Sequence, residues 1–210
     1  MKRLFIAINL PEQLKNSIAQ IITDLDADMR RRSVEESTFR WIPKEQWHLT
    51  ITFLGYQPDE AIGPILKSIK QTVFDYSNIL KNNRIVFEKI ILAPPGKTPR
   101  MIWLDTTKET SKTLGIIKNK LEDELVKNGV RFQRENREYH AHLTLARFRS
   151  PLINADYKRI NADIISVNQR SNQRESALLA FYASSLDLME SHLKPTGAEY
   201  EILAKIDFFE

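Results

Sequence analysis

Cysteine is absent from this chain of 210 residues. Its absence excludes disulfide bonds and thiolate nucleophiles, and it is compatible with a reducing cytoplasm, where we expect the protein to be. Long apolar runs are also missing, because no segment approaches the roughly 20 apolar residues that a membrane-spanning helix needs. The short run from Leu4 to Leu10 ends at Pro11 without a cleavage site, so it predicts a strand rather than a secretory signal. We therefore expect a soluble protein with no membrane partner.

The charge balance shows only a small excess of one sign. The 31 Lys and Arg residues against 27 Asp and Glu residues give a formal net charge of +4. This bias suits a polyanionic partner without requiring one. The hydrophobic content of 42% is enough for an ordinary core, and the length predicts a single domain of two lobes over residues 1–210.

Apolar spacing along the chain alternates between the period of a strand and that of a helix. It predicts strands at residues 3–10, 47–54, 84–92, 101–106 and 139–148, and helices at about 12–29, 60–75 and 114–128. The segment APPGKTPR, residues 93–100, has three prolines and a glycine, so we expect a linker or an exposed loop. The segments ALLAFYASSLDLM and EYEILAKIDFF predict a closing β-hairpin around a turn at Pro195 to Gly197.

The strand at residues 47–54, WHLTITFL, has polar side chains at alternate positions. Successive side chains of a strand point to opposite faces. One face would therefore carry Trp47, Leu49, Ile51 and Phe53, and the other His48, Thr50 and Thr52. The first face is expected to pack in the core, which leaves the histidine and the threonines on a polar face.

The tripeptide His-Leu-Thr recurs in the strand at residues 139–148, YHAHLTLARF. By the same alternation one face would carry Tyr139, Ala141, Leu143 and Leu145, and the other His140, His142 and Thr144. His48 and His142 occupy equivalent places in a repeated order of strand, helix, loop and strand. We interpret this order as an internal repeat, which predicts a pseudo-symmetric α+β fold with the two polar faces opposed across a cleft.

Two imidazoles that face one site can form a general acid and a general base. A lone strand histidine is more often structural, so the interpretation depends on the pair. The ordinary histidine pKa of about 6.5 allows one ring to be neutral and the other protonated near pH 7. The hydroxyls of Thr50 and Thr144 can donate hydrogen bonds to phosphate oxygens, and Arg147 can add a charge-assisted contact. This set predicts an anionic phosphoryl centre with no metal.

These motifs resemble those of the 2H phosphoesterases, and within them the bacterial and archaeal RNA 2',3'-cyclic phosphodiesterases, also called 2'-5' RNA ligases. The resemblance runs over nearly the whole chain, through RLFIAINLP, RWIPKEQWHLTITFLG, IWLD, HLTLAR and LMESHLKPTGAEY. It implies a two-lobed, pseudo-symmetric α+β fold in which antiparallel sheets line a central cleft and helices lie outside. Each lobe would contribute one His-x-Thr motif, at residues 48–50 and 142–144.

The resemblance also implies a reaction, which is the hydrolysis of an RNA 2',3'-cyclic phosphate end to a 2'-phosphate without a cofactor. His48 would be the proton donor to the departing 3'-oxygen, and His142 the proton acceptor that activates water. Thr50, Thr144 and Arg147 would bind the phosphate. RNA with a cyclic phosphate end is the expected partner, and no protein partner is evident.

Three alternatives stay open on the sequence. The same centre could act on a small cyclic phosphate, or it could catalyse weak 2'-5' ligation, because substrate choice depends on cleft width and rim residues. The third alternative is a non-catalytic RNA-binding module, which would bind RNA with a strong salt dependence and leave its end unchanged. Such a module would have no chemical need for two opposed imidazoles.

Other polar and aromatic residues near the motifs receive structural interpretations. His140 is expected at the rim of the cleft. The pair of His140 and His142 lacks the further ligands that a zinc site needs, so we expect no metal. Strand parity places Trp47, Phe53 and Tyr139 in the core rather than against RNA bases.

Overall fold

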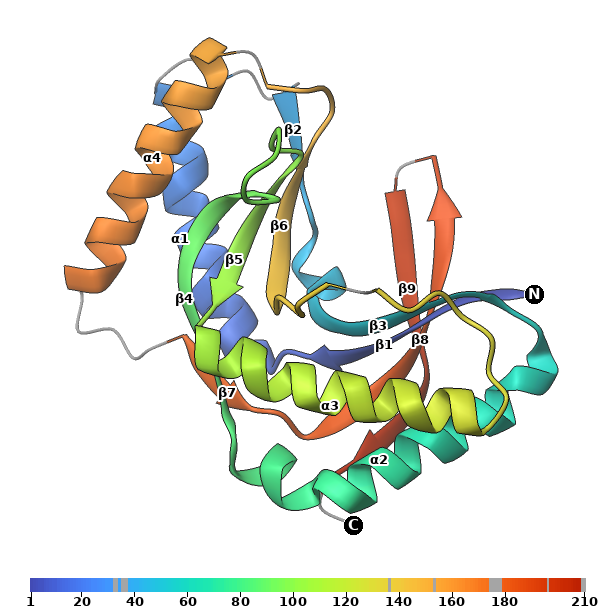
Figure 1. The fold of residues 1–210 in the computed structure, drawn as a ribbon. Helices are drawn as coiled ribbons and strands as arrows, with labels where there is room; N and C mark the ends of the chain where they lie inside the picture. Colours follow the sequence, from blue (N-terminus) through green and yellow to red (C-terminus); the bar gives the residue numbers. More distant parts are fainter. Residues whose placement is uncertain are drawn as a thin grey trace.

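Two antiparallel sheets and the helices beside them make up the computed structural model of the protein (Figure 1). It describes residues 1–31, 34, 38–135, 137–152, 154–173, 179–195 and 197–208. The first sheet has the strand order β3-β1-β8-β9, and the second has the order β2-β6-β5-β4-β7. The paired strands run antiparallel in both sheets. The α+β class with antiparallel sheets is therefore confirmed.

The strands and helices have these bounds. The first sheet consists of β3 (His48–Gln57), β1 (Lys2–Asn9), β8 (Ser185–Lys194) and β9 (Gly197–Asp207). The second consists of β2 (Phe39–Trp41), β6 (His142–Phe148), β5 (Met101–Thr106), β4 (Arg84–Ala93) and β7 (Ala180–Tyr182). The helices are α1 (Glu12–Arg31), α2 (Ile62–Asn82), α3 (Lys108–Lys127) and α4 (Asn154–Gln173), with short 3-10 turns η2 (Lys44–Gln46) and η3 (Asp59–Ala61).

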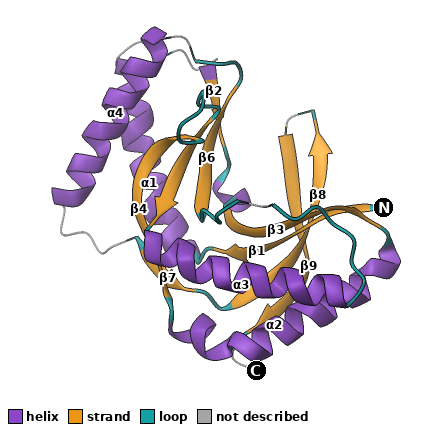
Figure 2. Cartoon of the chain, in the orientation of Figure 1, coloured by secondary structure: helices purple, strands orange, loops and turns teal. Residues whose placement is uncertain are grey.

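The helices form two pairs. Helices α2 and α3 lie side by side along the first sheet, and α1 and α4 lie side by side at the second sheet (Figures 1 and 2). The apolar positions predicted for the third helix, Leu114, Ile117, Leu121 and Leu125, are all buried. No helix in the described part of the chain is both long and apolar enough to cross a membrane.

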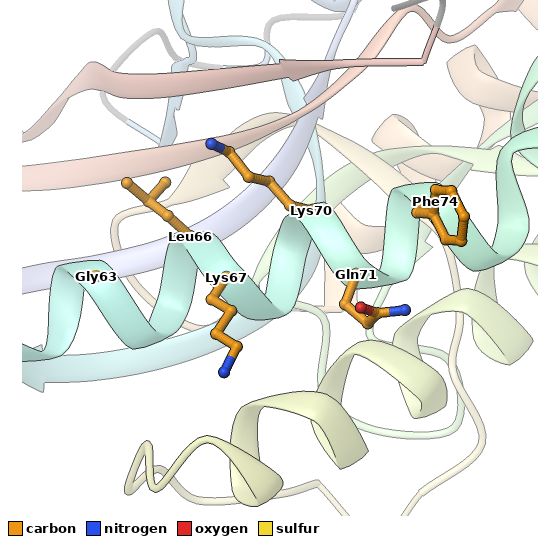
Figure 3. A pocket seen from close by; sticks show the side chains of 6 residues that line it. All are labelled: Gly63, Leu66, Lys67, Lys70, Gln71 and Phe74. Carbon is orange, nitrogen blue, oxygen red and sulfur yellow. The ribbon is translucent and has the colours of Figure 1, made fainter.

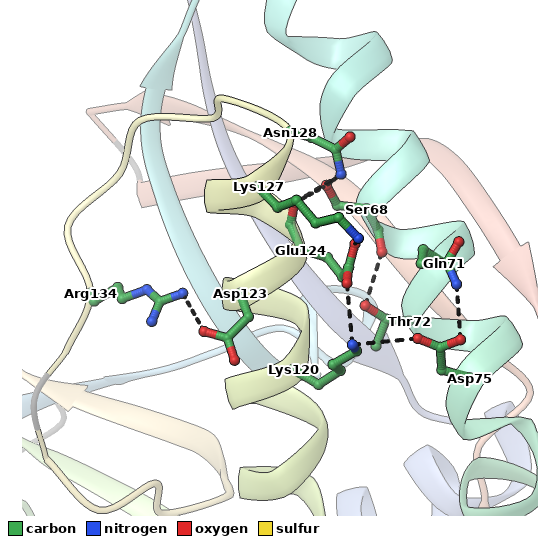
Figure 4. Close-up of polar contacts among 10 residues, drawn as sticks. All are labelled: Ser68, Gln71, Thr72, Asp75, Lys120, Asp123, Glu124, Lys127, Asn128 and Arg134. Carbon is green, nitrogen blue, oxygen red and sulfur yellow. Dashed lines mark hydrogen bonds and ion pairs between the residues drawn. The ribbon is translucent and has the colours of Figure 1, made fainter.

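A network of polar contacts joins α2 to α3 (Figure 4). Lys120 of α3 forms ion pairs with Asp75 of α2 and with Glu124 of its own helix, at 3.5 and 3.2 Å. Asn128, just after α3, donates to the hydroxyl of Ser68 at 3.1 Å. The buried face of α2 therefore tolerates a serine because its hydroxyl has partners on the neighbouring helix.

Most predicted elements are present. Residues 94–100 form the loop of the hairpin between β4 and β5, which the backbone hydrogen bond from Arg100 N–H to the Ala93 carbonyl closes at 2.7 Å. The prediction missed α4 and the short strand β2. The segment from Ala180 to Tyr182, which was expected in the closing hairpin, instead pairs with β4 in the second sheet. The hairpin itself is β8 with β9, and Thr196 of its turn lies outside the described residues.

The second histidine strand begins three residues later than predicted. It starts at His142, because Asp105 with His142 is the last pair between β5 and β6. Ala141 continues past the end of the ladder, where its N–H bonds to the Ser111 hydroxyl at 3.0 Å and its carbonyl accepts from Thr106. Because the N–H of Ala141 bonds to a side chain instead of a strand carbonyl, the regular pairing of β5 with β6 ends at His142.

The alternation predicted for the first histidine strand is wrong beyond Ile51. Thr50 pairs with Ala7 and Thr52 with Ile6, so Ile51 is an extra residue, which makes a β-bulge. A bulge reverses the faces of the residues that follow it. Thr52 is consequently buried, and Phe53, expected in the core, is 56% exposed.

Thr52 has a structural contact in its buried position. Its hydroxyl donates to a carboxylate oxygen of Glu122 on α3 at 2.8 Å. Glu122 also forms a buried ion pair with Lys118 at 2.7 Å. Thr52 therefore attaches β3 to the helix behind it, on the face opposite His48.

Candidate active site

Both motif histidines have the same hydrogen bond to the main chain. The Nδ1 of His48 lies 2.8 Å from the carbonyl oxygen of Gln46, and the Nδ1 of His142 lies 2.8 Å from the carbonyl oxygen of His140. A carbonyl only accepts, so each Nδ1 carries a proton and donates it. The Nε2 of each neutral ring is then left with a lone pair. Each motif thus presents an Nε2 that can take up a proton and later return it.

The two rings rest on different aromatic supports. His48 contacts Phe5 of β1 and Tyr200 of β9, each with a centroid distance of 4.9 Å. His142 stacks on Trp103 of β5, with centroids 3.6 Å apart and planes 15° apart. The sequence did not indicate these three supports, because the register that brings them beside the histidines depends on strands far apart in the chain.

Burial lowers the pKa of both histidines to about 4. For His48 the positive charges of Arg147 and Lys15 act in the same direction. For His142 the charges of His140, Arg137 and Arg147 do so. Both rings are therefore neutral near pH 7, which differs from the expectation of one neutral and one protonated ring. A group of cations around two partly buried neutral imidazoles favours the binding of an anion.

Two contacts connect the motifs. Arg147, on β6 and exposed, acts electrostatically on both histidines. Tyr139, just before β6, donates its hydroxyl to the carbonyl oxygen of Thr50 at 2.7 Å. Tyr139 packs against the core as predicted, and burial raises the pKa of its phenol. Strands β3 and β6 of the two sheets are also in contact with each other.

The predicted phosphate-binding threonines lie at matching places. Thr50 pairs with Ala7 of the neighbouring strand β1, and Thr144 pairs with Trp103 of the neighbouring strand β5. Each threonine lies two residues after its histidine, on the same face and partly exposed. The guanidinium of Arg147 touches the sulfur of Met101 at 3.4 Å. Trp47, by contrast, is buried in the core as predicted.

His140 is held by a carboxylate. Its Nε2 lies 2.5 Å from Oδ1 of Asp105, which also accepts from the backbone N–H of Thr106 at 2.9 Å. Asp105 is buried, and His140 is exposed beside the Trp103 ring. The ring of His140 is thus engaged with a neighbour rather than poised with His142 as two metal ligands.

A metal-ligand geometry occurs elsewhere in the described residues. Glu190, His192 and Glu201, on the hairpin of β8 and β9, place ligand atoms within 4.8 Å of one another. Their carboxylates already have partners, since Lys2 pairs with Glu190 at 2.5 Å and His192 with Glu201 at 3.2 Å. They lie on β8 and β9, whereas the motif histidines lie on β3 and β6.

Two hollows occur away from the motif histidines. One, of about 590 Å³, lies along α2 (Figure 3). Figure 3 shows Leu66 and Lys70 on the opposite side of the helix from Lys67 and Gln71, so these side chains flank α2 instead of enclosing a cavity. The other, of about 450 Å³, lies between α4 and β4.

The fold and the paired motifs define a 2H phosphoesterase-like protein. The same fold occurs in a Thermus thermophilus protein, with a TM-score of 0.65, 22% identity and coverage of 98% of this chain and 97% of that one. It occurs also in Escherichia coli LigT, solved in complex with 3'-AMP, with a TM-score of 0.64, 18% identity and coverage of 100% and 99%.

The family follows from the sequence comparison. The model of the AKAP7 2'5' RNA ligase-like domain matches residues 4–208, and the chain belongs to this family. Two curated relatives are named RNA 2',3'-cyclic phosphodiesterase. One, from Methanocaldococcus jannaschii, is 27% identical over 201 residues, which is 96% of this chain and 98% of the relative. The other, from Bacillus subtilis, is 28% identical over 144 residues, which is 68% and 69%.

Proposed function

We propose that the protein hydrolyses RNA 2',3'-cyclic phosphate ends to 2'-phosphates, with His48 and His142 as acid and base and without a metal. The names of the two relatives support the reaction. The observation that carries the mechanism is the matched pair of Nδ1 hydrogen bonds, since it leaves one Nε2 from each motif for proton transfer. The one-domain, two-lobe division with a motif in each lobe is part of the same proposal.

The reaction would proceed by one displacement at phosphorus. His142 Nε2 takes a proton from water as the water oxygen bonds to phosphorus. The bond from phosphorus to the 3'-oxygen breaks, and His48 Nε2 delivers a proton to that oxygen. Thr50 and Thr144 would donate to the non-bridging oxygens, while Arg147 would offset the charge that develops.

The low pKa of the free rings shapes this mechanism. A neutral His142 with Nδ1 protonated is ready to act as a base near pH 7. His48 must gain a proton before it can act as an acid. The anionic phosphodiester can promote that uptake, because a negative charge beside an imidazole favours its protonated form.

The donor set around the motifs supports a mechanism without metal. The Nδ1 atoms of both motif histidines are hydrogen-bonded to backbone carbonyls, and the Nε2 of His140 is hydrogen-bonded to Asp105. Zinc usually needs three or four protein ligands. The described residues bring together three candidate ligands only on the β8–β9 hairpin.

The test is to incubate the protein and excess EDTA with a short RNA that ends in a 2',3'-cyclic phosphate. Conversion to a 2'-phosphate is expected, and His48→Ala or His142→Ala should lower turnover by about 10²-fold or more. Thr50→Ala and Thr144→Ala should have smaller effects. Circular dichroism should remain close to wild type in all four variants, and RNA binding should do so in the two histidine variants. A 3'-phosphate product, or activity that EDTA abolishes, would contradict the proposal. If a folded protein binds the RNA but does not convert it, the result would favour a small cyclic phosphate as the substrate, or a non-catalytic RNA-binding module.

A further inference from the structure

The hollow between α4 and β4 lies on the same sheet as the second motif. Its volume is about 450 Å³. Its lining residues come from two strands, one helix and the loop after β4, among them Lys89, Ile91, Asp105, Tyr157, Asn161 and Ile165. Its walls therefore come from segments far apart in the chain, unlike those of the hollow along α2.

The strand register connects this hollow to His142. Lys89 of β4 pairs with Asp105 of β5, and Asp105 pairs with His142 of β6. Side chains directly opposite one another on paired strands lie on the same face of a sheet. The wall at Lys89 is thus two strand spacings, or about 10 Å, from His142. On the same face, the next set of paired residues consists of Ile91 of β4, Trp103 of β5 and Thr144 of β6.

Helix α4 is anchored along a part of the β4 edge that pairs with no strand among the described residues. Strand β7 pairs with β4 only from Arg84 to Val86. Farther along, the side-chain amide of Asn168 takes the place of a strand, since it accepts from the N–H of Ile90 and donates to the same residue's carbonyl, both at 2.9 Å. This pair of hydrogen bonds holds one wall of the hollow against the sheet.

The lining has apolar surfaces and unused polar groups. Tyr157 is 41% exposed and Ile165 is 48% exposed, so both offer apolar area to a ligand. In the part of the chain that the structure describes, no hydrogen bond or ion pair occupies the amide of Asn161 or the ammonium of Lys89. A nucleobase needs flat apolar contacts on its faces and a few polar groups at its edge. Asp105 is already engaged with His140, which makes the hollow poor in metal ligands.

We propose that this hollow binds the base of the terminal nucleotide while its cyclic phosphate lies at His48 and His142. The inference rests on the proposed function, since that function places the phosphate. Two strand spacings are about the reach of a ribose and its base from a bound phosphate. Tyr157 and Ile165 would contact the base, and Asn161 would hydrogen-bond its edge.

The test uses two matched isoleucines on helix surfaces. Ile165→Glu places a carboxylate in the hollow, and Ile116→Glu makes the same change on α3, where Ile116 is 47% exposed. Binding of adenosine 2'-monophosphate and of inorganic phosphate is measured by calorimetry for the wild type and both variants. We expect Ile165→Glu to weaken nucleotide binding about tenfold, the size of one lost base contact. Phosphate binding should be unchanged, and Ile116→Glu should behave as wild type.

Three results would overturn the proposal. They are an unchanged nucleotide affinity in Ile165→Glu, an equal loss in Ile116→Glu, and an equal loss of phosphate affinity, which would indicate charge repulsion. Turnover of adenosine 2',3'-cyclic phosphate separates this proposal from the proposed function. An inactive wild type with the expected binding results would refute the function and support the hollow. If the wild type is active and its KM is the same as that of both variants, the result would refute base binding in the hollow and leave the proposed function intact.

Discussion

The histidine rings provide a sensitive test of the site, because both should titrate far below the ordinary range. A pKa of about 4 instead of about 6.5 corresponds to roughly 3 kcal/mol against the protonated ring. This value is an upper limit, since both rings keep an edge exposed to water. The test is a pH titration of the free protein, monitored by NMR of the imidazole C–H protons. The variants His48→Asn and His142→Asn assign the signals.

The same shift predicts a dependence of stability on pH. In the unfolded chain each ring has its ordinary pKa of about 6.5, so between pH 6.5 and 4 the unfolded state binds more protons than the folded state. The contribution of the two neutral rings to the free energy of unfolding is complete above pH 6.5 and is lost as the pH falls toward 4. Urea unfolding at several pH values should show a steeper decline for the wild type than for His142→Asn.

The cause of the shift can be tested separately. Arg147→Gln removes a positive charge that acts on both rings, so it should raise both pKa values. The rise should be small, on the order of 0.5 or less, because burial is the largest cause and a solvated charge is well screened. Titration of both wild-type rings near 6.5 would refute the argument from burial. A change confined to one ring in Arg147→Gln would refute a site shared by the two motifs.

Three further predictions concern the framework of the site. Glu122→Ala should lower the free energy of unfolding by about 3–5 kcal/mol in a urea titration, because it leaves Lys118 buried and unpaired. The control Asp123→Ala breaks an exposed ion pair, so it should lower the free energy of unfolding by about 1 kcal/mol or less. Ile51→Ala should cost about 2–5 kcal/mol and the exposed Phe53→Ala much less, and equal costs would contradict the bulge. Tyr139→Phe should cost about 1–3 kcal/mol by thermal or urea unfolding, since the Thr50 carbonyl loses its donor, and no loss would show that this contact is dispensable.

Local sequence patterns were enough to predict many of the helices and strands and the residue types of the candidate site. Alternation and helical spacing depend on neighbours in the chain, so they predicted β1, β5 and the buried face of α3. The repeated His-Leu-Thr likewise stood out because it is written in the sequence twice. These features need no knowledge of which strands pair.

The surroundings of the two rings depend on how distant strands pair, which local sequence patterns do not specify. The bulge at Ile51 moves the following side chains of β3 to the opposite faces of the sheet, because of how β3 pairs with β1. No residue type in β3 predicts this bulge. The supports of the rings, Trp103 for His142 and Phe5 with Tyr200 for His48, come from other strands whose register depends on the whole sheet. Burial against these partners lowers the pKa of both histidines, so their protonation state could not follow from residue type alone.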